Sequence, residues 1–205
     1  GTSIWTSYKE GKRDFGDFVL PDGMKKNQKL EKPVLTPTTK HEAHDRNLTS
    51  KMVVEEKLMS PELWQKVSDI ALKLFTCGQE IALERGLILV DTKYEFGLTS
   101  EGEIILIDEI HTPDSSRYWQ ANSYKERIEQ GLEPENFDKE FLRLWFKDNC
   151  DPYKDEKLPE APAEMVTELS RRYVKICEQI TGIPFEIESG DIEKRIENNL
   201  KKYQI

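Results

Sequence analysis

The chain lacks the features that would place it in a membrane, a disulfide scaffold or a zinc ribbon. None of its apolar runs approaches the length needed to cross a bilayer, so we expect no membrane partner. Its three cysteines, Cys77, Cys150 and Cys177, lie far apart and form no Cys-x-x-Cys pair. This odd number and wide spacing favour neither a disulfide framework nor a zinc site, and they indicate a reducing, cytoplasmic location.

Basic residues are also too few for a typical nucleic-acid-binding protein. The 30 lysines and arginines are outnumbered by 39 aspartates and glutamates, giving a net charge of −9. Nucleic-acid-binding surfaces are usually basic, so we expect no nucleic-acid partner. Neither Gly-x4-Gly-Lys-Ser/Thr nor Gly-x-Gly-x-x-Gly occurs, so a bound nucleotide would need an unconventional phosphate loop or one upstream of Gly1.

Helical and extended patterns occupy separate blocks, which predicts an α+β fold with an antiparallel sheet packed against helices. Residues 1–59 form a loop-rich segment. A helix follows, capped by Ser60 and closed by Gly86, then a hairpin over roughly 87–110 and a polar loop through Arg117. The helix should bury one stripe of side chains: Leu63, Val67, Ile70, Ala71, Leu74 and Ile81.

Three further helices and a single domain complete this interpretation. A short helix is expected over 138–147. The next carries Met165, Leu169, Tyr173, Ile176 and Ile180 and ends at Gly182 and Pro184. The last carries Ile192, Ile196, Leu200 and Tyr203. The length of 205 residues suits one domain over 1–205.

Charged side chains alternate with apolar ones from Val90 to Phe96. Because a strand sends residues i, i+2 and i+4 to one side, Asp91, Lys93 and Glu95 should line a single face. If Glu101-Gly102 forms a two-residue turn, Glu95 lies directly opposite Asp108. A three- or four-residue loop would shift this register.

Two opposed carboxylates repel each other and therefore favour a cation between them. Oxygen ligands suit a divalent metal, so Glu95 and Asp108 are candidate ligands of Mg²⁺. The alternative is an ordinary solvated strand face. Ile104, Leu106 and Ile110 would share the face of Asp108, which argues for a metal or phosphate site.

Weaker signals come from two other regions. His41 and His44 are three residues apart rather than four, so no zinc-protease site is expected. Lys40 and Asp45 flank these histidines, and their segment fits a ligand-binding loop and a plain surface loop equally well. Arg117 and Arg143 carry guanidinium groups suited to carboxylate or phosphate, although single arginines are commonly surface ion-pair partners.

Two motifs resemble the SAICAR synthetase (phosphoribosylaminoimidazole-succinocarboxamide synthase) family. They are Asp91-Thr92-Lys93-Tyr94-Glu95-Phe96-Gly97 and the run from Asp108 through Thr112-Pro113-Asp114-Ser115-Ser116-Arg117 to Trp119. Further similar segments are Thr36–Lys40, His44-Asp45 and Phe137–Arg143, in the expected order. The resemblance implies ligation of L-aspartate to carboxyaminoimidazole ribonucleotide (CAIR), with ATP as co-substrate and Mg²⁺ as cofactor.

The resemblance also implies a role for each matched position. Glu95 and Asp108 match acidic positions at magnesium and the ATP phosphates. Substrate-binding positions are matched by Ser3, Lys40, Asp45, Lys93, Arg117 and Arg143. Asp91, Lys93 and Asp114 match polar positions around the reacting groups and are the candidate catalytic residues.

Family members carry an N-terminal subdomain that covers ATP, and Gly1-Thr2-Ser3 corresponds to a point after it. The resemblance therefore implies a partner subdomain of the same protein and incomplete activity of this piece alone, and a homo-oligomer stays open. Two other functions compete. One is a different ATP-dependent carboxylate–amine ligase, and the other is a non-catalytic anion-binding module.

Overall fold

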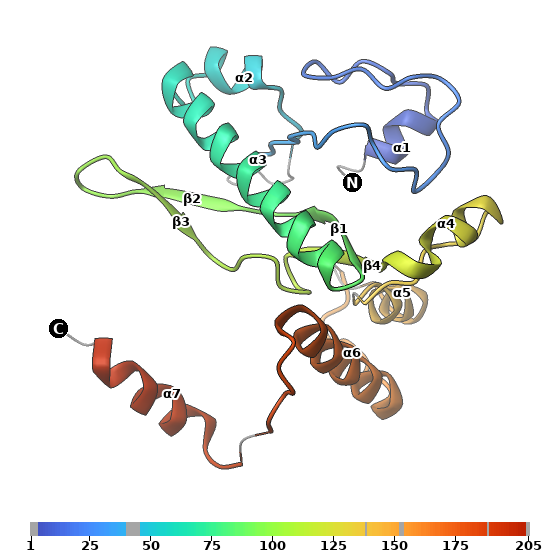
Figure 1. The fold of residues 1–205 in the computed structure, drawn as a ribbon, viewed down its shortest axis with the longest axis vertical. Helices are drawn as coiled ribbons and strands as arrows, with labels where there is room; N and C mark the ends of the chain where they lie inside the picture. The colour runs from blue at the N-terminus through green and yellow to red at the C-terminus, as the bar shows by residue number, and fades with distance from the viewer. Residues whose placement is uncertain (1–3, 40–45, 138, 152–153, 188, 204–205) are drawn as a thin grey trace.

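The structure, a computed structural model, describes residues 4–39, 46–137, 139–151, 154–187 and 189–203. It confirms an α+β architecture of helices around short antiparallel ladders (Figure 1). The helices are α1 (Ile4–Lys9), α2 (Ser50–Glu55), α3 (Pro61–Glu84), α4 (Ala121–Glu129), α5 (Glu140–Asn149), α6 (Ala163–Thr181) and α7 (Ile192–Leu200), which runs into a 3₁₀ turn at Lys201–Tyr203. The strands are β1 (Leu87–Thr92), β2 (Glu95–Leu98), β3 (Ile104–Ile107) and β4 (Ser116–Gln120).

The long helix α3 has the boundaries that its sequence predicts. The Ser60 hydroxyl accepts a hydrogen bond from the Leu63 N–H at 3.2 Å, and Pro61 fills the first turn. The helix ends at Glu84, just before Gly86. Its buried side includes Val67, Ser68, Ala71, Gly78 and Ala82. The expectation that Ile81 is buried was wrong, because this side chain lies on the exposed side of the helix.

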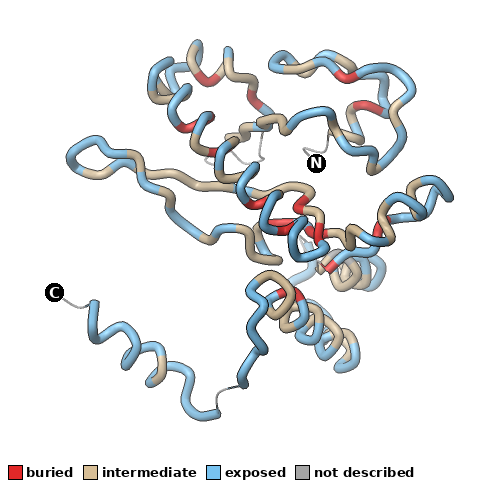
Figure 2. Tube along the Cα trace, viewed as in Figure 1, coloured by how far each residue is buried: buried red, intermediate tan, exposed pale blue. Residues whose placement is uncertain are grey.

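The hydrophobic core lies where α3, β1, β4 and α6 meet. Its buried members are Ala82, Leu87, Leu89, Tyr118, Phe137 and Ile176, with Phe75 and Ile180 packed against them. Figure 2 shows buried residues gathered at the lower end of α3 and along β1, whereas α7 is almost entirely exposed. The expected helices over α5, α6 and α7 are all present, and Gly182 closes α6.

The strands form two separate two-stranded antiparallel ladders. β1 pairs with β4, and β2 pairs with β3. The expected polar loop through Arg117 was wrong in its last residues, because Ser116–Gln120 forms strand β4. Ser116 and Tyr118 of this strand are buried and Arg117 is exposed. β4 therefore places Arg117 on the exposed face of the β1–β4 ladder.

The predicted register of the β2–β3 hairpin was wrong by one residue. Glu95 pairs with Ile107 rather than Asp108, and Leu98 pairs with Ile104. The turn uses three residues, since the Thr99 N–H donates to the Glu103 carbonyl at 2.9 Å and the Gly102 N–H donates to the Thr99 carbonyl at 3.0 Å. Gly102 has a φ of +82°, which a glycine adopts readily at the left-handed position of such a loop.

A one-residue bulge in β1 decides which way Asp91 points. Leu89 lies opposite Tyr118 on the buried face, and simple alternation would send Asp91 to that same face. The register shifts between Leu89 and Asp91, so that Asp91 lies opposite Arg117 instead. The bulge therefore turns the carboxylate from the core toward the exposed face.

The described part of the N-terminal segment contains α1 and α2, which were not predicted. Tyr8 is its organising side chain. The Tyr8 hydroxyl donates to the Pro21 carbonyl at 2.8 Å and accepts from the Met24 N–H at 3.0 Å. The segment reaches α4, a further helix missed from sequence, where the Tyr124 hydroxyl donates to the Asn27 carbonyl at 2.8 Å.

No helix in the described part of the chain is both long enough and apolar enough to span a membrane. All three cysteines lie in this part and are present as free thiols.

Candidate active site

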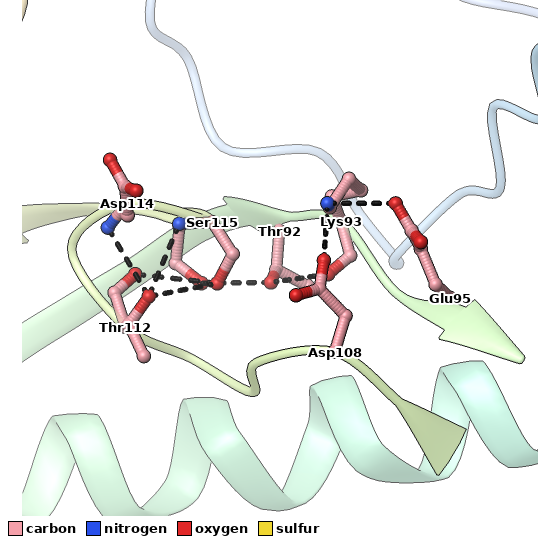
Figure 3. A network of polar contacts seen from close by, with 8 residues as sticks. Thr92, Lys93, Glu95, Asp108, Thr112, Asp114 and Ser115 are labelled. Atoms are coloured by element: carbon pink, nitrogen blue, oxygen red, sulfur yellow. Dashed lines mark hydrogen bonds and ion pairs between the residues drawn. The ribbon is translucent and has the colours of Figure 1, made fainter. Parts of the chain in front are cut away.

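Lys93 joins two carboxylates, one at the start of β2 and one just after the end of β3. Its ammonium donates to Glu95 Oε1 at 2.9 Å and to Asp108 Oδ2 at 2.7 Å (Figure 3). Lys93 follows β1, Glu95 opens β2, and Asp108 follows the last residue of β3. Asp108 has a φ of +67°, a left-handed conformation that Asp adopts more readily than most residues. This turn brings its carboxylate to Lys93 although the register differs from the predicted one.

Lys93 and Asp108 shift each other's pKa. Hydrogen bonds from Lys93 lower the pKa of Asp108 below its ordinary value. Hydrogen bonds to Asp108, and then to Glu95, raise the pKa of Lys93. All three side chains are about 40% exposed. Because exposed ion pairs contribute little to folding, this cluster is suited to binding a charged ligand rather than to holding the fold.

Replacing Lys93 by Met should raise the pKa of Asp108 toward its usual value, because the main group that stabilises the ionised carboxylate is removed. In the native protein the folded-state pKa lies below the unfolded one. Ionised Asp108 therefore favours folding above the unfolded pKa, and this contribution is lost as the pH falls through the folded pKa. Carboxyl ¹³C NMR titration of both proteins measures the shift. An unchanged Asp108 titration would contradict this explanation.

Asp91 and Arg117 form a second ion pair beside this cluster. Arg117 Nε donates to Asp91 Oδ1 at 3.0 Å, and Arg117 Nη2 contacts Asp91 Oδ2. The two parallel contacts fix the plane of the guanidinium, and more than half of the arginine side chain stays exposed. The pair holds a planar cation at the surface, where a carboxylate or phosphate could reach it.

Asp114 lies in a turn that hydroxyl groups organise. Thr112 Oγ1 accepts from the N–H groups of Asp114 and Ser115, each at 3.3 Å (Figure 3). The network continues to β1 through Ser116 Oγ and Thr92 Oγ1, which lie 2.8 Å apart. The turn therefore has a defined position relative to the strand that carries Asp91.

The structure adds Lys139 to the site, a residue that the sequence interpretation did not select. Its ammonium pairs with Asp114 across 25 residues of sequence. Hydrogen bonding to this carboxylate raises the pKa of Lys139. Lys139 directly precedes α5, and its carbonyl accepts from the Arg143 N–H at 3.0 Å. The only sequence signal for it was its place in the segment Phe137–Arg143.

A histidine and a tyrosine beside these charges also escaped the sequence interpretation. His111 Nε2 contacts the Tyr94 hydroxyl, and the imidazole packs against α3 at Gly78. A Cβ atom at Gly78 would overlap the ring. Glycine inside a helix costs about 1 kcal/mol relative to alanine. A glycine inside the predicted helix was therefore the one sequence signal that another group approaches α3 closely at position 78.

The predicted site residues divide into three groups. The structure brings together Asp91, Lys93, Glu95, Asp108, Asp114 and Arg117 at one end of the two ladders. Arg143 is exposed on α5, one helical turn after Lys139. Ser3, Lys40 and Asp45 lie outside the described residues, as do His41 and His44.

Glu95 and Asp108 are the carboxylates that could bind Mg²⁺. Glu95 and Asp108 offer carboxylate oxygens within reach of one shared ammonium. In the described part of the chain, no three His, Cys, Asp or Glu side chains come together as a complete metal cage. Mg²⁺ at phosphate-transfer sites usually takes one or two carboxylates and completes its shell with substrate phosphates and water. The residues therefore fit a magnesium–nucleotide site rather than a protein-enclosed metal centre.

Comparison with known proteins gives a consistent result. The family profile described as SAICAR synthetase matches residues 4–160. A curated Legionella pneumophila (strain Paris) protein, "Phosphoribosylaminoimidazole-succinocarboxamide synthase", is 55% identical over 98% of this chain, which spans 65% of that protein.

Two solved structures are similar in fold. "SAICAR-synthase from Saccharomyces cerevisiae complexed SAICAR" matches with a TM-score of 0.73 and 33% identity, over 89% of this chain and 57% of that one. "SAICAR synthetase (Type-2) in complex with ADP" matches with a TM-score of 0.56 and 28% identity, over 82% and 57%. The chain thus spans less than two thirds of each of these proteins.

Proposed function

The chain belongs to the SAICAR synthetase family, and we propose that its protein ligates L-aspartate to CAIR, consuming ATP and releasing SAICAR, ADP and phosphate in purine biosynthesis. The observation that carries the proposal is the shared Lys93 ammonium between Glu95 and Asp108, adjacent to the Asp91–Arg117 pair. The family match includes all of these residues. We assign residues 1–205 to one catalytic domain that holds the imidazole-nucleotide site and part of the ATP site.

The proposed reaction has two steps. A CAIR carboxylate oxygen attacks the γ-phosphorus of ATP, and ADP leaves. The aspartate amine then attacks the carbonyl carbon of the acyl phosphate, forming the amide bond as phosphate leaves with its electron pair. The amine gives up its proton in this step. Both steps concentrate negative charge, so they need fixed cations and exclusion of water.

The residues of this chain supply the fixed charges. We assign Arg117 and Lys93 to the anionic imidazole nucleotide, with Asp91 holding the guanidinium in its plane. Lys93 also keeps Glu95 and Asp108 together despite their repulsion. We assign Asp114, which forms an ion pair with Lys139, to the surroundings of the reacting groups. Ser3, Lys40, Asp45 and Arg143 complete the substrate contacts in this proposal.

Glu95 and Asp108 would hold Mg²⁺ against the phosphates of ATP. When bound, the ion supplies positive charge to the oxygens of the transferring phosphoryl group. Removing Mg²⁺ with EDTA should abolish ADP release, and added Mg²⁺ should restore it. Asp108→Asn should raise the Mg²⁺ concentration for half-maximal rate by about tenfold or more. A rate that does not depend on Mg²⁺ would contradict the assignment.

The function is tested by incubating the full-length protein with ATP, CAIR and L-aspartate and measuring ADP and SAICAR together. Equal amounts of the two products are expected. A panel of other imidazole nucleotides and amines separates this enzyme from another carboxylate–amine ligase, which would prefer a different pair. An anion-binding module would bind nucleotide without turnover, and Glu95→Gln would leave its affinity unchanged.

A cytoplasmic location is part of the proposal. The three free thiols fit a reducing compartment. The proposed partners are the small-molecule substrates.

A further inference from the structure

Tyr94 and His111 join the two segments that carry the acidic residues of the site. Tyr94 lies between Lys93 and Glu95, in the connection from β1 to β2. His111 lies between Asp108 and Asp114, in the connection from β3 to β4. The Tyr94 hydroxyl contacts His111 Nε2, and the ring centroids are 5.5 Å apart at an interplanar angle of 59°.

His111 is fixed from two further directions. Its imidazole packs against α3 where Gly78 leaves room for the ring. Its backbone carbonyl accepts a hydrogen bond from the buried Tyr118 hydroxyl at 2.7 Å. Its φ of +55° is a conformation that L-residues adopt uncommonly, so the contacts around it must maintain it. The aromatic contact thus ties both connections to the core helix.

The contact joins two neutral groups. Burial lowers the pKa of His111 and raises the pKa of Tyr94 to about 12. Both side chains are half-buried. If the Tyr94 hydroxyl is removed, His111 Nε2 loses its hydrogen-bond partner while it stays half-buried. Its lost hydration is then no longer compensated, so we expect the position of His111 to be destabilised.

We propose that Tyr94 and His111 are positioning residues of this ligase site. Clamped to each other and to α3 at Gly78, they set the place of Asp108 against Lys93 and of the turn that carries Asp114. Neither side chain needs to touch a substrate. The inference rests on the proposed function, because it assigns the purpose of the clamp to the ligation reaction.

The geometry favours positioning over plain packing. Successive side chains of an extended segment point to opposite sides. Tyr94 therefore faces α3, whereas Lys93 and Glu95 lie on the other side, where they belong to the exposed charged cluster. Between β3 and β4 the chain turns twice in four residues, at Asp108 and His111. The direct backbone link between the two connections is the Lys93 N–H to the Ser115 carbonyl, at 3.1 Å. A rotation at His111 would therefore move the acidic residues on either side of it.

The test is Tyr94→Phe in the full-length protein, which removes one hydroxyl and keeps the ring. We expect kcat to fall about tenfold with KM values within about twofold, because small misplacements of fixed groups are costly to the chemical step. Amide hydrogen exchange at Lys93 and Ser116 should accelerate about tenfold, since both amides donate to carbonyls of the Thr112–Ser115 turn. Melting temperatures show whether the fold is retained.

Tyr124→Phe is the matched control. It also removes a tyrosine hydroxyl that donates a hydrogen bond, here to the Asn27 carbonyl at 2.8 Å, but on α4. Its kcat and the exchange at Lys93 and Ser116 should equal those of the wild type. A similar fall in kcat for this control would attribute the effect to general loosening and overturn the inference.

Gly78→Ala perturbs the same clamp from the opposite side. Alanine favours the helix, yet its Cβ would displace the His111 ring, so kcat should again fall. Combining it with His111→Ala should raise the melting temperature above that of Gly78→Ala while kcat stays low. Wild-type kcat and exchange in both Tyr94→Phe and Gly78→Ala would overturn the inference. Absence of SAICAR formation by the wild type would instead contradict the proposed function, with exchange still reporting on the clamp.

Discussion

Lys93→Met should lower kcat/KM for the ligation by about a thousandfold, the largest effect expected of any substitution in this chain. The substitution removes the ammonium shared by Glu95 and Asp108 and leaves two carboxylates repelling each other. It also removes a cation assigned to the imidazole nucleotide. Steady-state kinetics with each substrate varied in turn measure the effect. The melting temperature should change by no more than about 2 °C, since the cluster is exposed.

Lys26→Met is the control for Lys93→Met. Lys26 forms an ion pair of similar exposure with Glu133, away from the site. Its loss should leave kcat/KM within about twofold of the wild type. If Lys93→Met retained most of the activity, or lost it only by unfolding, the assignment of this cluster to the reaction would be wrong.

Arg117→Lys should lower kcat/KM by about a hundredfold, mainly through a higher KM for the imidazole nucleotide. A lysine keeps the charge but cannot make two parallel contacts to Asp91 or present a planar fork to an anionic substrate. Equilibrium binding of CAIR by calorimetry provides an independent measure. Asp91→Asn should show the same trend to a smaller degree, because the guanidinium then loses its orienting partner.

The matched control is Arg171→Lys on α6. Arg171 also makes two contacts to one carboxylate, with Nε to Glu168 Oε2 at 2.8 Å and Nη2 to Glu168 Oε1 at 3.0 Å. Equal losses of activity in the two variants would show that the guanidinium geometry at Arg117 has no special role in binding substrate.

The helices were largely predictable because their signals are local. Ser60, Pro61 and Gly86 mark the ends of α3, and apolar spacing identified α6 and α7. Two of the three missed helices, α1 and α2, have only six residues each, too few for a periodic pattern. Ile81 was wrongly predicted to be buried, because helical spacing identifies the apolar face of a helix but not which parts of that face other elements cover.

The strands were less predictable because pairing is a relation between distant residues. Ser116 and Arg117, the first two residues of β4, were assigned to a loop, since the burial of this strand depends on pairing with β1. The hairpin register depended on one residue of loop length, and the three-residue turn at Gly102 moved Asp108 out of line with Glu95. The alternation of side chains along β1 does not predict the bulge before Asp91. It would have placed this carboxylate on the same face as Leu89.

The sequence by itself determined most of the charged residues of this site and the motifs that carry them, in a family pattern specific enough to identify, but it did not select Lys139, Tyr94 or His111. Tertiary structure decided their partners, namely Lys93 between two carboxylates, Asp91 with Arg117, Asp114 with Lys139, and His111 with Tyr94. The physical reason is the distance along the chain over which each property is determined. Residue types and periodicity are written along the chain, whereas an ion pair requires two side chains, often from separate strands, to meet within about 4 Å. A bulge, a turn residue or a helical glycine decides whether two such side chains come this close.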